Sequence, residues 1–295
     1  MGPLLFILAF DGIFRVPLSE GSLLVGYADD VTYTKAVMHD CDLDTINEDL
    51  GCITSWISTH GLRLNLSKVK QLVISRKKHP PPAVITINGS QIERVPSFKL
   101  LGVLVQSDLS WRLHIQDTCY RSKRLLGFIY RVFSEADRHY LCYLFKTLVL
   151  PILDYASCIW DPHYAKHNLK LERVQSFAAR IATRSWSAEA TPLKRSLHWP
   201  LLSARRKLQK ISLCRRILSG ASLVPDDLFQ RHPHPGKRSH KNSSPLYHPF
   251  VRTLHHKAAF HIAVVDLWNS VPEEVVCCTS DKTFKKRLKA WLLVT

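Results

Sequence analysis

The stretch Leu23–Tyr33 constrains the fold most, because two apolar, β-prone runs flank the adjacent carboxylates Asp29 and Asp30. This pattern predicts a strand, a tight turn and a second strand, with both acids at the tip. Successive side chains of a strand point to opposite faces, so adjacent acids can share a face only at a turn. The sequence therefore predicts a β-hairpin that presents two carboxylates together.

Two interpretations of these acids remain open from the residues alone. Like charges among apolar neighbours repel one another, and a bound cation would relieve that repulsion. Mg²⁺ suits such ligands, since it takes one or two carboxylates and completes its shell with water and substrate phosphates. A polar hairpin turn without any ligand is the alternative, because Asp is common in turns.

The net charge predicts a polyanionic partner. The 295-residue chain carries 41 Lys and Arg against 24 Asp and Glu, a formal charge of +17. Neutralising phosphates releases condensed counterions and drives binding to nucleic acid without regard to sequence. An anionic membrane surface is the competing partner on charge alone. The apolar run Leu4–Phe10 is shorter than the ~20 residues of a membrane span and lacks the features of a signal peptide. We therefore expect an intracellular protein with no membrane segment.

The cysteines and histidines give no specific metal motif. None of the eight cysteines forms a C-x-x-C pair, so we expect reduced thiols, mostly buried. Several histidines crowd one region, but no cysteine lies close enough to complete a familiar zinc finger. Solvated or phosphate-contacting histidine is the favoured interpretation for His232, His234, His240, His248, His255, His256 and His261.

Periodicity predicts an α+β first half. A helix between His39 and Gly61 should cover one face of the sheet that carries the aspartates. Asn88-Gly89, flanked by expected strands at Val84–Ile87 and Ile92–Val95, is the strongest short hairpin signal in the chain. The other predicted elements of this half are an interrupted helix at Leu4–Val16, a strand pair at Arg63–Leu66 and Gln71–Ser75, and a strand at Phe98–Val105.

From Trp111 onward the apolar period becomes helical. A first stripe contains Ile115, Cys119, Leu125, Ile129 and Val132, and further helices are expected at Tyr140–Leu150, ended by Pro151, at Leu169–Ala182, at Leu201–Leu218 and at Lys282–Leu293. Two of these helices should expose basic faces, formed by Lys170, Arg173 and Arg180 on one and by Arg205, Arg206, Lys207 and Lys210 on the other. Plain solvated helix surface is the alternative to phosphate contact for each residue. Pro225–Pro249 is expected to be a linker or loop.

Short blocks recur in the order found in one enzyme family. Tyr27-Ala28-Asp29-Asp30 resembles the Y-x-D-D motif of reverse transcriptases, and Met1–Phe6 resembles the end of the Q-G-x-x-x-G-P-L-L-F block of LINE-type, non-LTR retrotransposon enzymes. The later blocks are Leu64–Lys68, Phe98–Val103, Leu109–Trp111 with His114-Ile115, Pro151–Ala156, Trp160–Pro162, Trp268–Pro272, and Phe284-Lys285 with Leu288. No block is decisive, but their shared order is specific. The chain therefore resembles the jockey-like members of that family along nearly its whole length.

The resemblance implies an RNA-directed DNA polymerase, a nucleotidyltransferase of right-hand architecture. Residues 1–106 would form a partial palm, 107–224 a helical thumb, and 225–295 a basic linker with a C-terminal helical segment. Asp29 and Asp30 would be catalytic ligands of Mg²⁺, and Lys68 would protonate or stabilise the departing pyrophosphate. Primer and nucleotide contacts would come from Tyr27, Ala28, Phe98, Leu100 and Gly102. The partners would be an RNA template and a DNA primer, or their hybrid, in the nucleus or cytoplasm.

The chain departs from the family pattern at its beginning. The family's fingers and a further metal-binding aspartate precede the G-P-L-L-F block, and Asp11 comes after that block, so Asp11 does not correspond to it. We therefore expect an N-terminally truncated polymerase that is inactive by itself. The alternative is a non-catalytic nucleic-acid-binding protein derived from such a polymerase.

Overall fold

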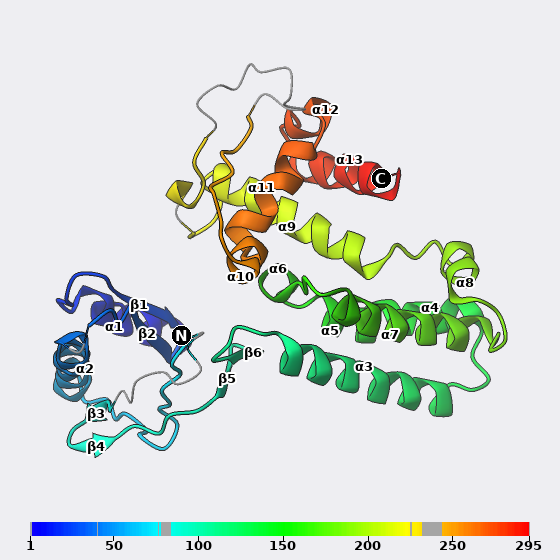
Figure 1. The fold of residues 1–295 in the computed structure, drawn as a ribbon. Coiled ribbons are helices and arrows are strands. Elements are labelled where there is room, and N and C mark those ends of the chain that lie inside the picture. The colour runs from blue at the N-terminus through cyan, green and yellow to red at the C-terminus, as the bar shows by residue number, and fades with distance from the viewer. Residues whose placement is uncertain are drawn as a thin grey trace. The chain divides into compact units, whose positions relative to one another are not determined.

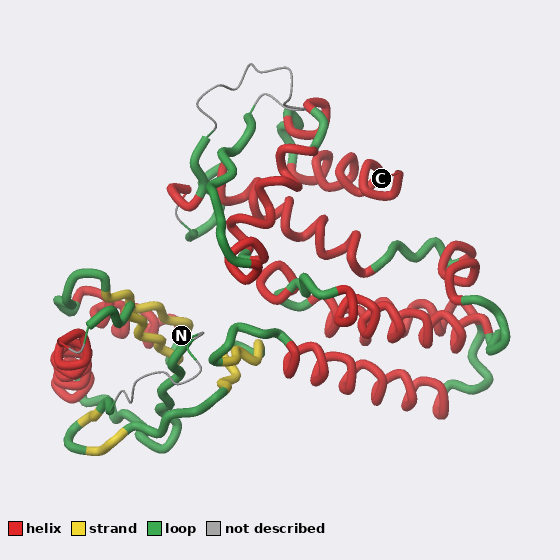
Figure 2. The backbone as a smooth tube through the Cα atoms, in the orientation of Figure 1, coloured by secondary structure: helices red, strands yellow, loops and turns green. Residues whose placement is uncertain are grey.

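The computed structural model describes residues 2–39, 41–75, 77, 84–224, 226–231 and 244–294, which form helices and small two-stranded sheets (Figures 1 and 2). This mixture agrees with the expected α+β class. The chain divides into two compact units. One contains Met1–Leu100 and Val105–Leu109, and the other contains Leu101–Leu104 and Ser110–Thr295.

The first unit contains the predicted acidic hairpin and its covering helix. Strands β1 (Ser22–Tyr27) and β2 (Asp30–Lys35) pair antiparallel, and helix α2 spans Cys41–Thr59. The preceding segment forms α1 (Gly2–Phe10) and the 3₁₀-helix η1 (Asp11–Arg15). One face of the hairpin packs with α1, η1 and α2 in a core of Phe10, Ile13, Ile53, Leu24, Val31, Tyr33, Leu50 and Trp56. The prediction that the helix covers the sheet is confirmed.

A buried carboxylate ties α2 to the base of the hairpin. Asp49 of α2 is 4% exposed. Its Oδ2 accepts hydrogen bonds from the hydroxyls of Ser19, Ser22 and Tyr33 at 2.6, 2.6 and 2.7 Å, and its Oδ1 accepts one from the Ser19 backbone at 2.9 Å. Lys35 Nζ donates to the same two serine hydroxyls at 3.0 and 3.2 Å. The base of the hairpin is therefore fixed by charge-assisted hydrogen bonds as well as by apolar packing.

The rest of this unit confirms one predicted hairpin and corrects one predicted strand pair. Strands β3 (Thr86–Ile87) and β4 (Ser90–Gln91) join through Asn88 and Gly89, both with positive φ, so the turn lies where it was expected. The second strand is Ser90–Gln91 and not Ile92–Val95. Arg63–Leu66 and Gln71–Ser75 do not form a strand pair. Asn65 Oδ1 instead accepts from the Ser67 backbone and hydroxyl at 3.1 and 2.6 Å, and this local turn competes with strand formation. Gln71 forms only an isolated bridge with Arg94.

The segment predicted as one strand at Phe98–Val105 is a hairpin. Strand β5 (Ser97–Leu100) and strand β6 (Val103–Gln106) pair through the two-residue turn Leu101-Gly102. Leu101 and Gly102 have φ values of +45° and +84°, which suits the twist of a tight hairpin. The apolar run concealed the turn, because only Gly102 in it signals a chain reversal.

The second unit is helical. Its longer helices are α3 (Arg112–Val132), α7 (Ala165–Thr183), α9 (Leu202–Leu218), α11 (Phe260–Ser270) and α13 (Asp281–Val294). Its shorter helices are α4 (Arg138–Leu144), α5 (Leu150–Asp154), α6 (Ser157–Trp160), α8 (Ala190–Ser196), η3 (Asp226–Leu228), α10 (Leu254–Ala258) and α12 (Glu273–Val276). The periodicity predicted most of the long helices. On α3, however, Leu126 is buried in place of Leu125, and Val132 is 55% exposed.

Pro151 does not end the helix that precedes it. A π-helical turn, η2 (Phe145–Val149), comes after α4, and α5 continues through Pro151 to Asp154. Pro151 lies in the first turn of α5, where a missing N–H is tolerated. The prediction of a stop at Pro151 was therefore wrong.

The C-terminal segment shares one core with α9. Ile211, Cys214 and Ile217 of α9 pack with Val264, Val265 and Trp268 of α11 and with Phe284 and Leu288 of α13. The described ends of the expected linker also join this core. Leu246 exchanges two hydrogen bonds with the Asn269 side chain at 2.8 and 2.9 Å, and Phe229 is buried. Residues 232–243 of that expected linker lie outside the described ranges.

Candidate functional site

The two predicted acids lie at the tip of the β1–β2 hairpin. Tyr27 pairs with Asp30, so Ala28 and Asp29 form a two-residue loop, in which Ala28 has a φ of +54°. All four residues are exposed, Tyr27 to 69%. Gly26 lies just below the tip and packs closely on Phe14, because a Cβ there would lie 2.5 Å from Cζ of Phe14 and would displace that ring. The local sequence therefore produces a close-packed hairpin stem with a short, polar, accessible end.

The donor set at this tip fits a hard divalent cation. The carboxylates of Asp29 and Asp30 make no hydrogen bond or ion pair with any residue that the structure describes. Four oxygen atoms on adjacent residues are thus available to a ligand, and they match the chemistry of Mg²⁺. Within the described ranges, no three His, Cys, Asp or Glu side chains gather into a metal-binding group. Two carboxylates are enough where substrate phosphates complete the shell.

The other residues of the predicted primer, nucleotide and pyrophosphate sites lie in turns and on a second hairpin. Lys68 is exposed and ends the Asn65 turn, in which its backbone N–H donates to the Asn65 carbonyl at 3.0 Å. Phe98 is 38% exposed on β5, Leu100 is half-buried, and Gly102 occupies the β5–β6 turn.

The basic residues predicted to contact a nucleic-acid backbone separate into two groups. Lys170, Arg173 and Lys207 are exposed, and Arg180 is half-buried. Arg206 and Lys210 are 1% and 5% exposed, so the prediction of an exposed basic face is wrong for them. Half-buried Arg205 is also engaged within the protein. The sequence concealed this difference because every partner lies on another helix or loop.

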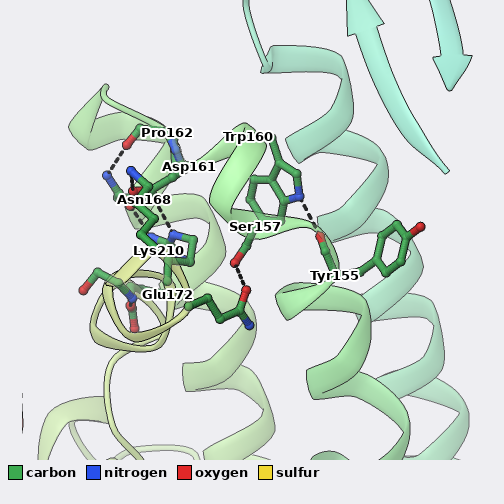
Figure 3. Close-up of polar contacts among 11 residues, drawn as sticks. Tyr155, Ser157, Trp160, Asp161, Pro162, Asn168, Glu172 and Lys210 are labelled. Carbon is green, nitrogen blue, oxygen red and sulfur yellow. Dashed lines mark hydrogen bonds and ion pairs between the residues drawn. The ribbon is translucent and has the colours of Figure 1, made fainter. Parts of the chain in front are cut away.

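The engaged cations bind acids that precede α7. Arg205 forms a two-pronged ion pair with Asp154, with Nε 2.9 Å from Oδ2. Asp161 forms ion pairs with two cations, through its Oδ1 with Arg206 Nε at 2.6 Å and through its Oδ2 with Lys210 Nζ at 2.7 Å. Figure 3 shows Asp161 and Lys210 facing one another. These contacts connect the Pro151–Pro162 region to α9. The three cations therefore stabilise the helical unit and are not available to an outside phosphate.

A second group of cations gathers where α3 packs on α7. Lys123 of α3 and Lys170 of α7 both lie near Cys119, where they oppose the burial that raises the pKa of its thiol. Burial lowers the pKa of His167, and Lys166, Lys170 and Arg112 lower it further. We call the exposed residues Arg112, Lys123, Lys166 and Lys170 the α3–α7 basic surface. Sequence reasoning missed Arg112 and Lys123, because the α3 periodicity was used only to find its apolar stripe, and it missed Lys166, because the helix expected there began at Leu169 and not at Ala165.

Comparison with known proteins gives a distant relation to one class of enzyme. The chain is 24% identical over 189 residues to the RNA-directed DNA polymerase from mobile element jockey of Drosophila funebris, and 22% identical over 243 residues to that of Drosophila melanogaster. These alignments cover 62% and 78% of this chain but only 20% and 26% of the relatives. No protein-family model and no solved structure matches. The comparisons support a relation to LINE-type reverse transcriptases. None of the helices in the described parts of the chain has the length and apolar character needed to cross a bilayer.

Proposed function

We propose that this chain is a palm and thumb portion of a non-LTR retrotransposon RNA-directed DNA polymerase, with Asp29 and Asp30 as its metal ligands. The observation that carries the proposal is the pair of unengaged carboxylates at the exposed tip of the β1–β2 hairpin. The distant relation to jockey polymerases and the shared order of motifs support it.

Each group of residues at the site would have a separate role. Asp29 and Asp30 hold Mg²⁺, which when bound favours the primer 3′ alkoxide and neutralises charge on the departing pyrophosphate. Tyr27 and Ala28 lie beneath the primer end. Lys68 offers its ammonium to the pyrophosphate, either as a proton donor or as a fixed charge. Phe98, Leu100 and Gly102 on the β5–β6 hairpin contact the primer strand.

The nucleic-acid backbone would lie along exposed and half-buried cations of the helical unit. We assign this role to the α3–α7 basic surface together with Arg173, Lys207 and Arg180. Binding through such contacts releases counterions, so the affinity for an RNA–DNA hybrid should fall steeply with salt. Arg205, Arg206 and Lys210 have no part in this assignment because their charges are paired internally.

Binding of a paramagnetic cation tests the metal site without requiring catalysis. Mn²⁺ has the same ligand preferences as Mg²⁺ and its free concentration is measured by electron paramagnetic resonance. The wild-type chain should bind Mn²⁺, and Asp29→Asn and Asp30→Asn should each weaken that binding at least about tenfold. Asp11→Asn, which removes an exposed acid of the same unit, is the matched control. Equal Mn²⁺ binding by all four proteins would refute the metal assignment.

Primer extension then separates the enzyme from the binding protein. The purified chain is given an RNA template, a DNA primer, nucleotides and Mg²⁺. Incorporation that Asp29→Asn abolishes would support catalysis by this chain. Salt-sensitive hybrid binding without incorporation would support the non-catalytic alternative, and loss of both would refute the nucleic-acid function.

A further inference from the structure

The β5–β6 turn has a backbone conformation that needs support from outside the hairpin. Leu101 and Gly102 are consecutive residues with left-handed φ values. Leu101 has a Cβ, so this conformation is unfavourable for it in isolation. Its side chain is 44% exposed, so core packing does not hold it in place.

Tyr155 supplies that support directly. Its hydroxyl donates a hydrogen bond of 2.8 Å to the carbonyl oxygen of Leu101. Its ring lies against Gly102, where an added Cβ would be 3.3 Å from the ring carbon Cε1 and 3.8 Å from the hydroxyl oxygen. The side chain of Tyr155 therefore fixes one residue of the turn by a hydrogen bond and the other by close contact.

A second contact attaches strand β6 of the hairpin to the region around Trp160. The N–H of Leu104 on β6 donates to Nδ1 of His114 at 3.2 Å. The His114 ring packs on Trp160, with centroids 5.1 Å apart. Trp160 is fully buried, and its Nε1 donates to the backbone carbonyl of Tyr155 at 2.7 Å, as Figure 3 shows. These contacts connect Leu101 to Leu104 through Tyr155, Trp160 and His114.

The segment that contains Tyr155 and Trp160 is held to α9 by ion pairs of Asp154 and Asp161 and by a hydrogen bond of Ser157. Asp154, next to Tyr155, pairs with Arg205. Ser157 donates to the side chain of Gln209 at 2.6 Å, and Asp161 pairs with Lys210. The backbone on both sides of Tyr155 is therefore held to α9.

We propose that Tyr155 is a positioning residue, which holds the Leu101-Gly102 turn in the shape that receives the 3′ end of a nucleic-acid strand. This inference rests on the proposed function, which places the β5–β6 hairpin at the primer. Tyr155 acts through the turn and does not itself contact the reacting atoms.

The test combines hydrogen exchange with end-specific binding. Tyr155→Phe removes only the hydroxyl, and Tyr143→Phe is the matched control, because Tyr143 is 58% exposed on α4. Exchange is measured by mass spectrometry on peptides covering residues 98–106. Binding is measured by fluorescence anisotropy with two probes, an RNA–DNA hybrid with a recessed DNA 3′ end and a hybrid of equal length closed by loops at both ends.

Loss of one neutral hydrogen bond should change both readouts by about two- to tenfold. Tyr155→Phe should increase exchange in residues 98–106 and weaken binding of the recessed hybrid, while affinity for the closed hybrid stays unchanged. Gly102→Ala, whose Cβ presses on the same ring, should give the same result. Tyr143→Phe should behave as wild type.

Three results would overturn the inference. Unchanged exchange would show that the hydroxyl does not hold the turn. Equal weakening of both hybrids would show that the turn does not distinguish a strand end, and faster exchange with unchanged affinities would show that the turn does not meet one. A wild-type chain that binds neither hybrid would instead refute the proposed function, and this inference with it.

Discussion

Replacing Asp49 with asparagine should destabilise the first unit and reduce its sensitivity to acid. The carboxylate accepts four hydrogen bonds from the base of the β1–β2 hairpin. An asparagine side chain has one oxygen acceptor and one nitrogen donor. It would leave at least one of the half-buried hydroxyls of Ser19, Ser22 and Tyr33 facing another donor.

The pKa of Asp49 gives the size of the effect. Burial would raise this pKa, but hydrogen bonds from Ser19, Ser22 and Tyr33 outweigh burial and lower it from 3.8 to about 2. A difference of this size between folded and unfolded chains corresponds to about 2 kcal/mol of stability. Because the folded pKa is the lower one, this stability is present above about pH 4 and is lost as the pH falls toward 2.

At high pH, Tyr33 makes the stability of the first unit change with pH in the opposite direction. Burial raises the pKa of Tyr33 from 10.0 to about 12. The Ser22 hydrogen bond opposes this rise, and the Asp49 carboxylate adds to it. The folded pKa is the higher one, so its contribution is present below pH 10 and is lost as the pH rises toward 12. Asp49→Asn should reduce this alkaline loss, because the anion that disfavours tyrosinate is gone.

Pulsed hydrogen exchange in increasing urea measures both effects, since peptides from β1, β2 and α2 report on the first unit separately. Asp49→Asn should lower the free energy of unfolding of these peptides by about 2 kcal/mol at pH 6 and flatten the acid limb. The control is Asp44→Asn, an exposed position on the same helix, where a loss below about 0.5 kcal/mol is expected. If both variants unfold at the same urea concentration and keep the acid limb, the reasoning is wrong.

Three further predictions concern the second unit. Asp161→Asn leaves two buried cations without their acid and should lower the free energy of unfolding in urea by about 3–5 kcal/mol. Adding Lys210→Met should restore part of this stability, and a double variant that recovers none of it would contradict the charge argument. Maleimide should modify exposed Cys41 in the native chain but should reach Cys214 only after unfolding, because burial covers the Cys214 thiol and raises its pKa. Peptide mapping that finds Cys214 labelled in the native chain would contradict this prediction. Phe284→Ala should lower stability by about 3–5 kcal/mol, whereas a loss below about 1 kcal/mol would place this ring outside the core.

The elements that were predicted correctly from the sequence are those whose signals lie within a short stretch of the chain. The apolar period of α2 identified a helix, Asn88-Gly89 identified a hairpin, and the stretch around Asp29 identified a tip with adjacent acids. Each signal depends on residues within a few positions of one another, so no distant contact is needed to interpret it.

The error in the basic face of α9 arose because distant partners decide the outcome. Arg206 looks like a solvated helix residue until Asp161, 45 positions earlier, is known to face it. The Tyr155 contact with Leu101 spans 54 positions and has no local signature. Asn65 is a different case, because it lies in a run with strand-like character and yet its own side chain closes a turn. Sequence reasoning therefore located the acids of the candidate site but not the side chains that position its second hairpin.

The π-helical turn before Pro151 sets the angular phase of α5 and of the residues just beyond it. A π turn holds one residue more than an α turn, so side chains after Val149 are rotated by about 100° from the directions that an uninterrupted helix would give them. Asp154 and Tyr155 meet Arg205 and Leu101 in this rotated phase. If the same residues formed an uninterrupted α-helix, both side chains would turn away from their partners, whereas deleting one residue from Phe145–Val149 would close the π turn into an α turn and keep both side chains in their present directions.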